Sequence, residues 1–194
     1  MIARRWLATA GLGSAGTRSY LPIPSDHLRW VLRFALAGTA AINLTINAAL
    51  AGLFTIGIRR VPAWSAPLIG GPSVVGNTLG TLVILPVTTS LLCTASIRVY
   101  QRGGLALLGP DHLPRLIRHL VVGPMRRGLR LAVLCLAAFG PLTILVGFVG
   151  AGGGLSRLGF IISQIAVGVL LGALVTPVVA VAAMAEAGPT PAPG

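Results

Sequence analysis

Four long stretches of the chain carry no charged side chain, and they set the architecture that the sequence predicts. They cover residues 34–58, 61–97, 131–156 and 158–185. The hydrocarbon core of a bilayer needs about 20 apolar residues in a helix that rises about 1.5 Å per residue. The first, third and fourth stretches therefore each predict one membrane-spanning helix. The second stretch has 37 residues, which is too long for one span and too short for two.

The second stretch divides into a loop and a helix. Its first part, residues 61–73, is rich in proline and glycine and contains Trp64, an aromatic residue that suits the membrane interface. We therefore expect an all-α fold, a polytopic four-helix bundle that forms a membrane domain over 28–185. Its spans are expected at 31–58, 74–97, 131–152 and 158–184, between an N-terminal arm over 1–27 and a proline-rich tail over 186–194.

Composition places the chain in the same class. Hydrophobic residues make up 55% of it and charged residues 9%, and the mean hydropathy is +0.90. Soluble domains carry about 25% charged residues, so the composition excludes a soluble globular enzyme. All basic residues are arginine, and alanine, glycine, proline and valine are abundant. This combination is typical of a GC-rich bacterial genome.

The charge is distributed unevenly and predicts an orientation. There are 15 arginines and three acids, which gives a net charge of +12. Twelve arginines lie in the N-terminal segment and in the loop between the second and third spans. Because positive residues accumulate on the cytoplasmic side, we expect a bacterial inner-membrane protein with both termini in the cytoplasm. The arginines predict anionic lipid headgroups as partners; nucleic acid is not expected, because the chain lacks the polar surface for such a patch.

The loop between the second and third spans predicts a short amphipathic helix over 111–122. Its apolar side chains fall on one face, Asp111 suits the N-cap, and Pro114 suits the first turn. We expect this helix to lie on the cytoplasmic leaflet, with its arginines on lipid headgroups. The alternative is a solvated helix that binds a soluble partner. The expected lipid-surface contacts are Arg115, Arg118, Arg126, Arg127 and Arg130.

The two halves of the membrane domain resemble each other. Arginine pairs precede the first and third spans at an offset of 97 residues, and a Gly-x-x-x-Gly pair followed by proline recurs in the second and fourth spans at offsets of 92 and 91. These offsets favour two tandem helical hairpins in the same orientation, related by an axis along the membrane normal. A competing match between 26–28 and 111–113 is incompatible with this alignment, and a chance resemblance is the alternative.

The predicted spans contain no Asp, Glu, Lys, Arg or His. Proton-coupled transporters usually carry such groups inside the membrane, so proton coupling is not expected unless another subunit supplies the group. Uncharged polar residues form a candidate intramembrane face: Asn43, Asn47, Asn77, Thr81 and Thr88. We favour hydrogen bonds between helices as their role, at about 0.6 kcal/mol each. The alternative is a site or track for a neutral solute.

Small residues on the second and fourth spans predict a helix-packing seam, where another backbone can approach closely. The seam residues are Gly76, Gly80, Gly168, Gly172 and Thr176. Their partner is either the other half of the seam in the same chain or a second copy. Pro86 and Pro177 predict helix kinks, which serve packing or open a binding site; we favour packing.

The sequence predicts no catalytic residue, no cofactor and no metal ion. The chain has no lysine and hence no Walker phosphate loop, and the Gly-x-Gly-x-x-Gly at 11–16 lacks the strand, helix and acid of a dinucleotide site. His27, His112 and His119 are expected as solvated interfacial residues, with a metal site as the alternative. Cys93 and Cys135 are expected as small buried residues. We therefore expect no enzyme activity.

Three segments of the membrane domain are distinctive: Asn-Leu-Thr-Ile-Asn at 43–47, the stretch 77–89 that ends in Leu-Pro-Val-Thr-Thr, and Leu-Val-Thr-Pro at 174–177. With them, the chain over 29–185 resembles a group of small bacterial four-span membrane proteins that have no assigned activity. The resemblance implies four spans and nothing about chemistry. We predict an integral membrane interaction or assembly component that self-associates through its small-residue seams. The alternative is a channel or permease for a neutral or weakly polar solute.

Overall fold

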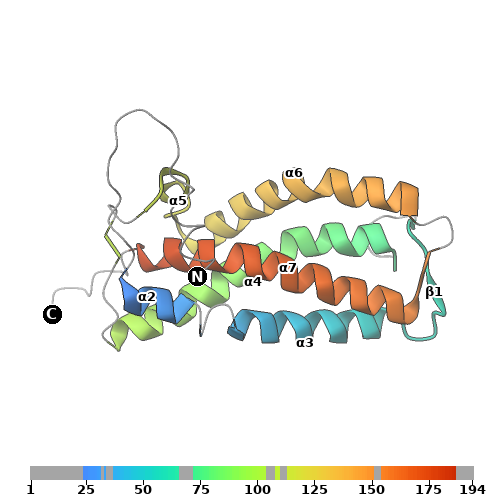
Figure 1. The fold of residues 1–194 in the computed structure, drawn as a ribbon, viewed down its shortest axis with the longest axis horizontal. Coiled ribbons are helices and arrows are strands. Elements are labelled where there is room, and N and C mark those ends of the chain that lie inside the picture. The colour runs from blue at the N-terminus through green and yellow to red at the C-terminus, as the bar shows by residue number, and fades with distance from the viewer. Residues whose placement is uncertain are drawn as a thin grey trace.

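The computed structural model describes residues 24–31, 33, 37–65, 72–103, 108–109, 113–150 and 154–186. Within these ranges, four apolar helices run along the long axis of the molecule (Figure 1): α3 (Ala37–Phe54), α4 (Val74–Arg102), α6 (Pro124–Gly150) and α7 (Arg157–Met184). The short helices α2 (Ser25–Trp30) and α5 (Arg115–Arg118) lie at one end, which we call the arginine-rich end. The strands β1 (Arg60–Val61) and β2 (Leu155–Ser156) lie at the other, the strand end. The predicted arm up to residue 23, Asp111, His112 and the tail from 187 lie outside the described residues.

Among the described helices, three are long and apolar enough to cross a membrane: α4, α6 and α7. They have 29, 27 and 28 residues. Helices of that length rise about 40 Å, more than the hydrocarbon core of about 30 Å. α3 has 18 residues and rises about 27 Å, so its length alone does not establish a fourth span. The predicted membrane character is confirmed for three helices.

The start of α6 lies earlier in the chain than predicted. The helix begins at Pro124 rather than at residue 131, and proline suits the first turn because its φ angle is fixed near the helical value. Arg126, Arg127 and Arg130 are therefore helical residues instead of loop residues. Arg126 and Arg130 lie four positions apart on one face of the helix and are exposed, whereas Arg127 lies on another face and is buried.

The helices pack in an order that differs from their order along the chain. α3 packs against α7, α7 packs against α4, and α4 packs against α6. Within the described residues, α3 hardly touches α4, and α6 makes only marginal contact with α7. Figure 1 shows α3 and α6 on opposite sides of α7 and α4. The four helices therefore form an open row, in which α3 and α6 each have one close neighbour, and a closed bundle is not established.

The packing order relates the two predicted hairpins. Within the described residues, the two helices of one hairpin hardly touch each other; the first helix of each packs on the second helix of the other. This exchange has the same form in both halves, as expected for hairpins related by a two-fold axis. The outer loops also meet, because β1 pairs antiparallel with β2 through Arg60↔Ser156 and Val61↔Leu155. The structure is mostly helical, as predicted, and this pairing of two-residue strands is a small addition to it. Strands of two residues carry no periodicity from which to predict them.

A stripe of small residues on α6 lies against α4. A Cβ atom added at Gly128 would lie 2.7 Å from the Cα atom of Val87, and one added at Gly147 would overlap the Val75 side chain. The buried stripe consists of Gly128, Ala132, Cys135, Gly140 and Gly147. Small residues let two membrane helices approach closely and gain van der Waals contact. At Gly128, α6 thus lies directly against the backbone of α4, whereas the small-residue seam was predicted on α4 and α7.

We expect Gly128→Ala to destabilise the protein by about 1–3 kcal/mol, because the added methyl group meets the α4 backbone, which cannot move aside. Gly140→Ala is the matched control, since its Cβ would meet only the Leu79 side chain at 3.9 Å. This control should be neutral or up to about 1 kcal/mol more stable, because alanine favours helix over glycine. Denaturant unfolding in detergent micelles measures both. Equal stabilities would contradict the close crossing.

Candidate functional site

Arg127 lies on the first turn of α6, and its side chain is completely buried. Its Nε donates to the carbonyl of Leu120 at 2.9 Å, and its Nη2 donates to the carbonyl of Val122 at 2.8 Å. Its Nη1 donates to Thr94 Oγ1 on α4 at 3.1 Å. A buried charge is tolerated only when it is paired and hydrogen-bonded. Arg127 meets this condition by joining α4, α6 and the turn that follows α5.

Glu186 supplies the negative charge for Arg127. It lies in the turn after α7, and its carboxylate forms an ion pair with Arg127 Nη2. Arg98 Nη2 on α4 approaches the other carboxylate oxygen at 3.5 Å. The prediction that Arg127 contacts the lipid surface is therefore wrong. The physical reason is that a carboxylate 59 residues away and three oxygen acceptors together replace the water that the guanidinium would otherwise need.

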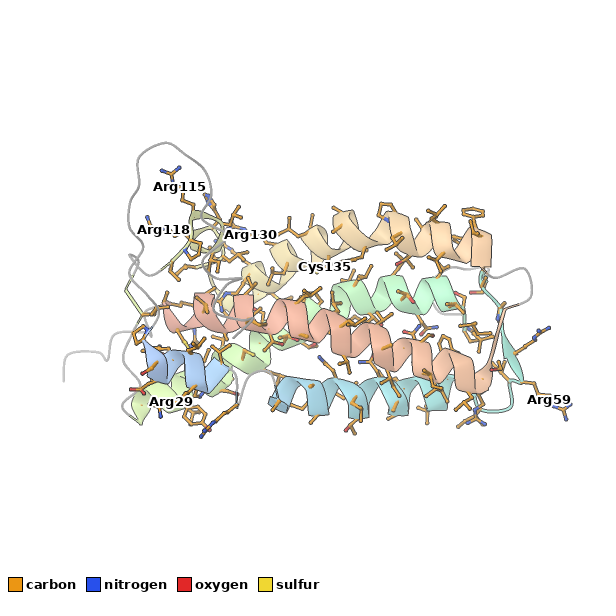
Figure 2. All side chains as sticks on the ribbon, viewed as in Figure 1. Arg29, Arg59, Arg115, Arg118, Arg130 and Cys135 are labelled. Atoms are coloured by element: carbon orange, nitrogen blue, oxygen red, sulfur yellow. The ribbon has the colours of Figure 1, made fainter. Side chains whose placement is uncertain are left out.

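The other four predicted lipid contacts remain at the surface or near it. Arg115 and Arg126 are exposed, and neither has a hydrogen bond or ion pair within the described residues. Arg130 is also exposed and donates to the carbonyl of His119. Arg118 is half-buried. Figure 2 shows Arg115, Arg118 and Arg130 gathered around α5 and the start of α6, at the end of the molecule opposite Arg59.

The amphipathic helix predicted over 111–122 is shorter than expected. In the described part of this region, helix α5 has four residues, with Pro114 at its N-cap. Leu113 and Leu120, expected to face lipid, are buried in two protein clusters, while Leu116 is 80% exposed. A longer helix could not use the Leu120 carbonyl, because Pro124 has no N–H to donate. The carbonyls of Leu120 and His119 instead accept hydrogen bonds from Arg127 and Arg130.

The five residues of the predicted polar face are not brought together. Asn43 and Asn47 lie on α3, whereas Asn77, Thr81 and Thr88 lie on α4, and these helices hardly touch. Four of the five side chains donate to a carbonyl four residues earlier in their own helix, at 2.8 to 2.9 Å: Asn47, Asn77, Thr81 and Thr88. The expected hydrogen bonds between helices are therefore not what these side chains make in the described residues.

Asn43 differs from the other four. It is 8% exposed, and its Nδ2 has no hydrogen-bond partner in the described structure. Thr176 on α7 is completely buried, and its Oγ1 has no partner there either. A hydrogen bond between α7 and α4 is instead made by residues outside the predicted face: Gln164 Nε2 donates to Thr78 Oγ1 at 3.2 Å. Its sequence signal was a lone amide side chain in an otherwise apolar span.

The predicted seam divides between two environments. On α7, Gly168 lies directly against the amide of Asn47, where any Cβ would overlap it, and Gly172 and Thr176 are also buried. The partner of this part is therefore α3 of the same chain. On α4, an added Cβ at Gly80 would have nothing within 4 Å. Gly76 is half-buried on the same helix.

Both predicted kink residues lie inside uninterrupted helices, Pro86 in α4 and Pro177 in α7. Pro86 lies at the crossing with α6, because its carbonyl oxygen would be 3.4 Å from a Cβ at Gly128. One turn further, Ser90 Oγ donates to the carbonyl of Pro124 at 2.7 Å. The proline turn of α4 therefore serves packing against the start of α6.

The described residues contain no group of three or more His, Cys, Asp or Glu side chains that could hold a metal ion. Cys93 and Cys135 are buried thiols in one hydrophobic cluster, as expected from the sequence. His27 is buried on α2, whereas His119 is exposed after α5. The geometry thus identifies the buried arginine network as the most elaborate polar arrangement that the structure describes.

No protein-family model, curated protein or solved structure matches the chain. The resemblance to small four-span membrane proteins therefore stays a prediction.

We expect Arg127→Gln to lower the free energy of unfolding by about 3–5 kcal/mol, because it removes the buried partner of Glu186 and leaves two carbonyls without a donor. Arg98→Gln is the matched control, since it removes the second and partly exposed partner of the same carboxylate. Its expected loss is at most about 1 kcal/mol. Denaturant unfolding of the purified protein in micelles gives both values. If the two substitutions had the same effect, Arg127 could not be buried in the folded protein.

Proposed function

We propose that the protein is an assembly component of a bacterial inner membrane, without catalytic chemistry of its own, and that it associates with a second copy of itself. In this proposal α3 is the fourth span, and both termini lie in the cytoplasm. α3 supports this because it packs along α7, a helix long enough to cross the membrane. Its exposed side chains are mostly apolar, including Ile42, Leu44 and Leu53. The arginine distribution supports the orientation.

The observation that carries self-association is an uncovered face on α4. Thr88 and Ile84 are exposed, and Asn77 and Thr81 are half-buried. These residues recur at helical spacing beside Gly80, where the space above the backbone is open. α4 is one of the two central helices of the row, so the uncovered face lies at the middle of the molecule rather than at its edge. A helix from a second copy fits there, because Gly80 allows close approach and the polar side chains gain a protein neighbour in place of lipid.

We expect Gly80→Leu to break the association while the single chain still folds, because no described residue lies within 4 Å of a Cβ added there. The intact mass of the complex in a mild detergent or polymer should fall from a multiple of 19.8 kDa to a single chain of 19.8 kDa. Gly38→Leu on α3 is the matched control, since Gly38 also has open space around it. Self-association would be refuted by a single-chain mass for the unmodified protein from native membranes. A stable second protein in the complex would instead make the chain an accessory subunit.

Passage of a neutral or weakly polar solute is the second candidate function. The observation in its favour is the pair of buried polar atoms without partners, Asn43 Nδ2 on α3 and Thr176 Oγ1 on α7. These two helices pack against each other. A buried donor without a partner is unfavourable by about 1–3 kcal/mol, which a passing solute would relieve. The separation of α3 from α4 counts against a continuous track along the predicted face.

Asn43→Leu separates the two functions. Under the assembly proposal, this variant should keep its stability and its oligomeric mass, because it replaces an amide without a partner by an apolar side chain of similar size. Asn47→Leu should be destabilising, because the Asn47 amide lies directly against Gly168. Swelling of proteoliposomes in glycerol or urea measures neutral solute flux. A flux that the unmodified protein supports and Asn43→Leu abolishes, with assembly intact, would establish transport.

A further inference from the structure

The chain has too few acids to neutralise the arginines around α5. It contains three acids, and the structure describes two of them, Asp26 and Glu186. Asp26 pairs with Arg29 on α2, and Glu186 pairs with Arg127 and Arg98. The third acid, Asp111, lies outside the described residues and carries at most one negative charge. Three arginines around α5 and the start of α6 have no ion pair with a described residue: Arg115, Arg126 and Arg130.

Two of these arginines donate no hydrogen bond to any residue that the structure describes. Arg115 and Arg126 are exposed and have no partner within the described residues. Each guanidinium carries five N–H donors in a planar fork that matches the oxygens of a phosphate group. Arg130 uses one nitrogen on the carbonyl of His119 and keeps the rest. Figure 2 shows Arg115, Arg118 and Arg130 at the same corner of the molecule.

Large apolar side chains are interleaved with these arginines. Leu116 follows Arg115 and is 80% exposed; Met125 and Leu129 flank the arginines of α6 and are 53% and 48% exposed. At a membrane surface, the arginines meet headgroups while the apolar side chains reach the acyl region.

We infer that the corner formed by α5 and the first turns of α6 binds the phosphate of an anionic phospholipid headgroup. Arg115 and Arg126 bind the phosphate oxygens, and Leu116, Met125 and Leu129 contact the acyl chains. This inference goes beyond the proposed function: it requires that the protein is in a membrane, and it does not require that the chain self-associates. A phospholipid is favoured over free phosphate because only the lipid covers the exposed apolar side chains.

The test uses the purified full-length chain in detergent, titrated with phosphatidylglycerol, and intact-mass measurement of the bound lipid. The variant Arg115→Gln/Arg126→Gln removes the two free arginines. Each arginine near an anionic lipid surface contributes about a fivefold change in affinity, so the double variant should bind about 25-fold more weakly. Arg59→Gln/Arg60→Gln is the matched control, because it removes two exposed arginines at the strand end. The control should bind the lipid as the unmodified chain does.

Two further probes complete the test. Phosphatidylcholine, which carries no net charge, should bind much more weakly than phosphatidylglycerol, and millimolar inorganic phosphate should not displace the lipid. Leu116→Gln should weaken lipid binding without changing the fold, since its side chain is exposed. Equal losses in the variant and the control would overturn the inference in favour of unspecific charge attraction. Displacement by inorganic phosphate, or an unchanged affinity of Leu116→Gln, would overturn it in favour of a site for a soluble anion.

Discussion

The buried guanidinium of Arg127 is the interaction on which the arrangement of the arginine-rich end depends. A charge without contact to water must be paired and hydrogen-bonded, and the partners of Arg127 come from α4, from the turn after α5 and from Glu186 beyond α7. These segments can meet only if α6 begins beside the last third of α4 and α7 ends nearby. The network therefore fixes how α4, α6 and α7 are aligned along their axes. Apolar contacts alone would not fix this alignment, because they allow helices to shift past one another.

Close backbone approach sets the rest of the packing. Membrane helices associate through van der Waals contact where small residues allow it, and the glycines on α6 and α7 do this against α4 and α3 respectively. Most polar side chains in these helices donate to a backbone carbonyl one turn earlier. They therefore do not determine which helices pack together. The fit between small and large residues determines which helices pack together. As a result, the first helix of each hairpin packs on the second helix of the other, and β1 pairs with β2 at the strand end.

Sequence patterns predicted the features that depend on local chemistry. The start of α4 at residue 74 and the last helix over 158–184 follow from proline-rich breaks and long apolar runs, and the structure has both nearly as predicted. The burial of Arg127 could not be predicted from the sequence, because it depends on Glu186, which is 59 positions away. The packing order of the helices could not be predicted either, since a stripe of small residues identifies the packing face of a helix but not the helix that packs against it. The Gly128-x-x-x-Ala132 spacing on α6 carried the missing signal.

Arg126 is exposed and Arg127 is buried although they are adjacent in the sequence. The small number of acidic side chains explains this difference. The chain has 15 arginines and three acids, so most of its positive charge cannot be neutralised by its own side chains. Glu186 forms ion pairs with Arg127 and Arg98. Of these two arginines, Arg127 is the buried one, because it also donates to neutral oxygen acceptors around it. Arg126, one position earlier, points away from that pocket of oxygens and stays exposed. In the lipid contact that we propose, the phosphate groups of an anionic membrane surface would supply the negative charge that the chain itself lacks.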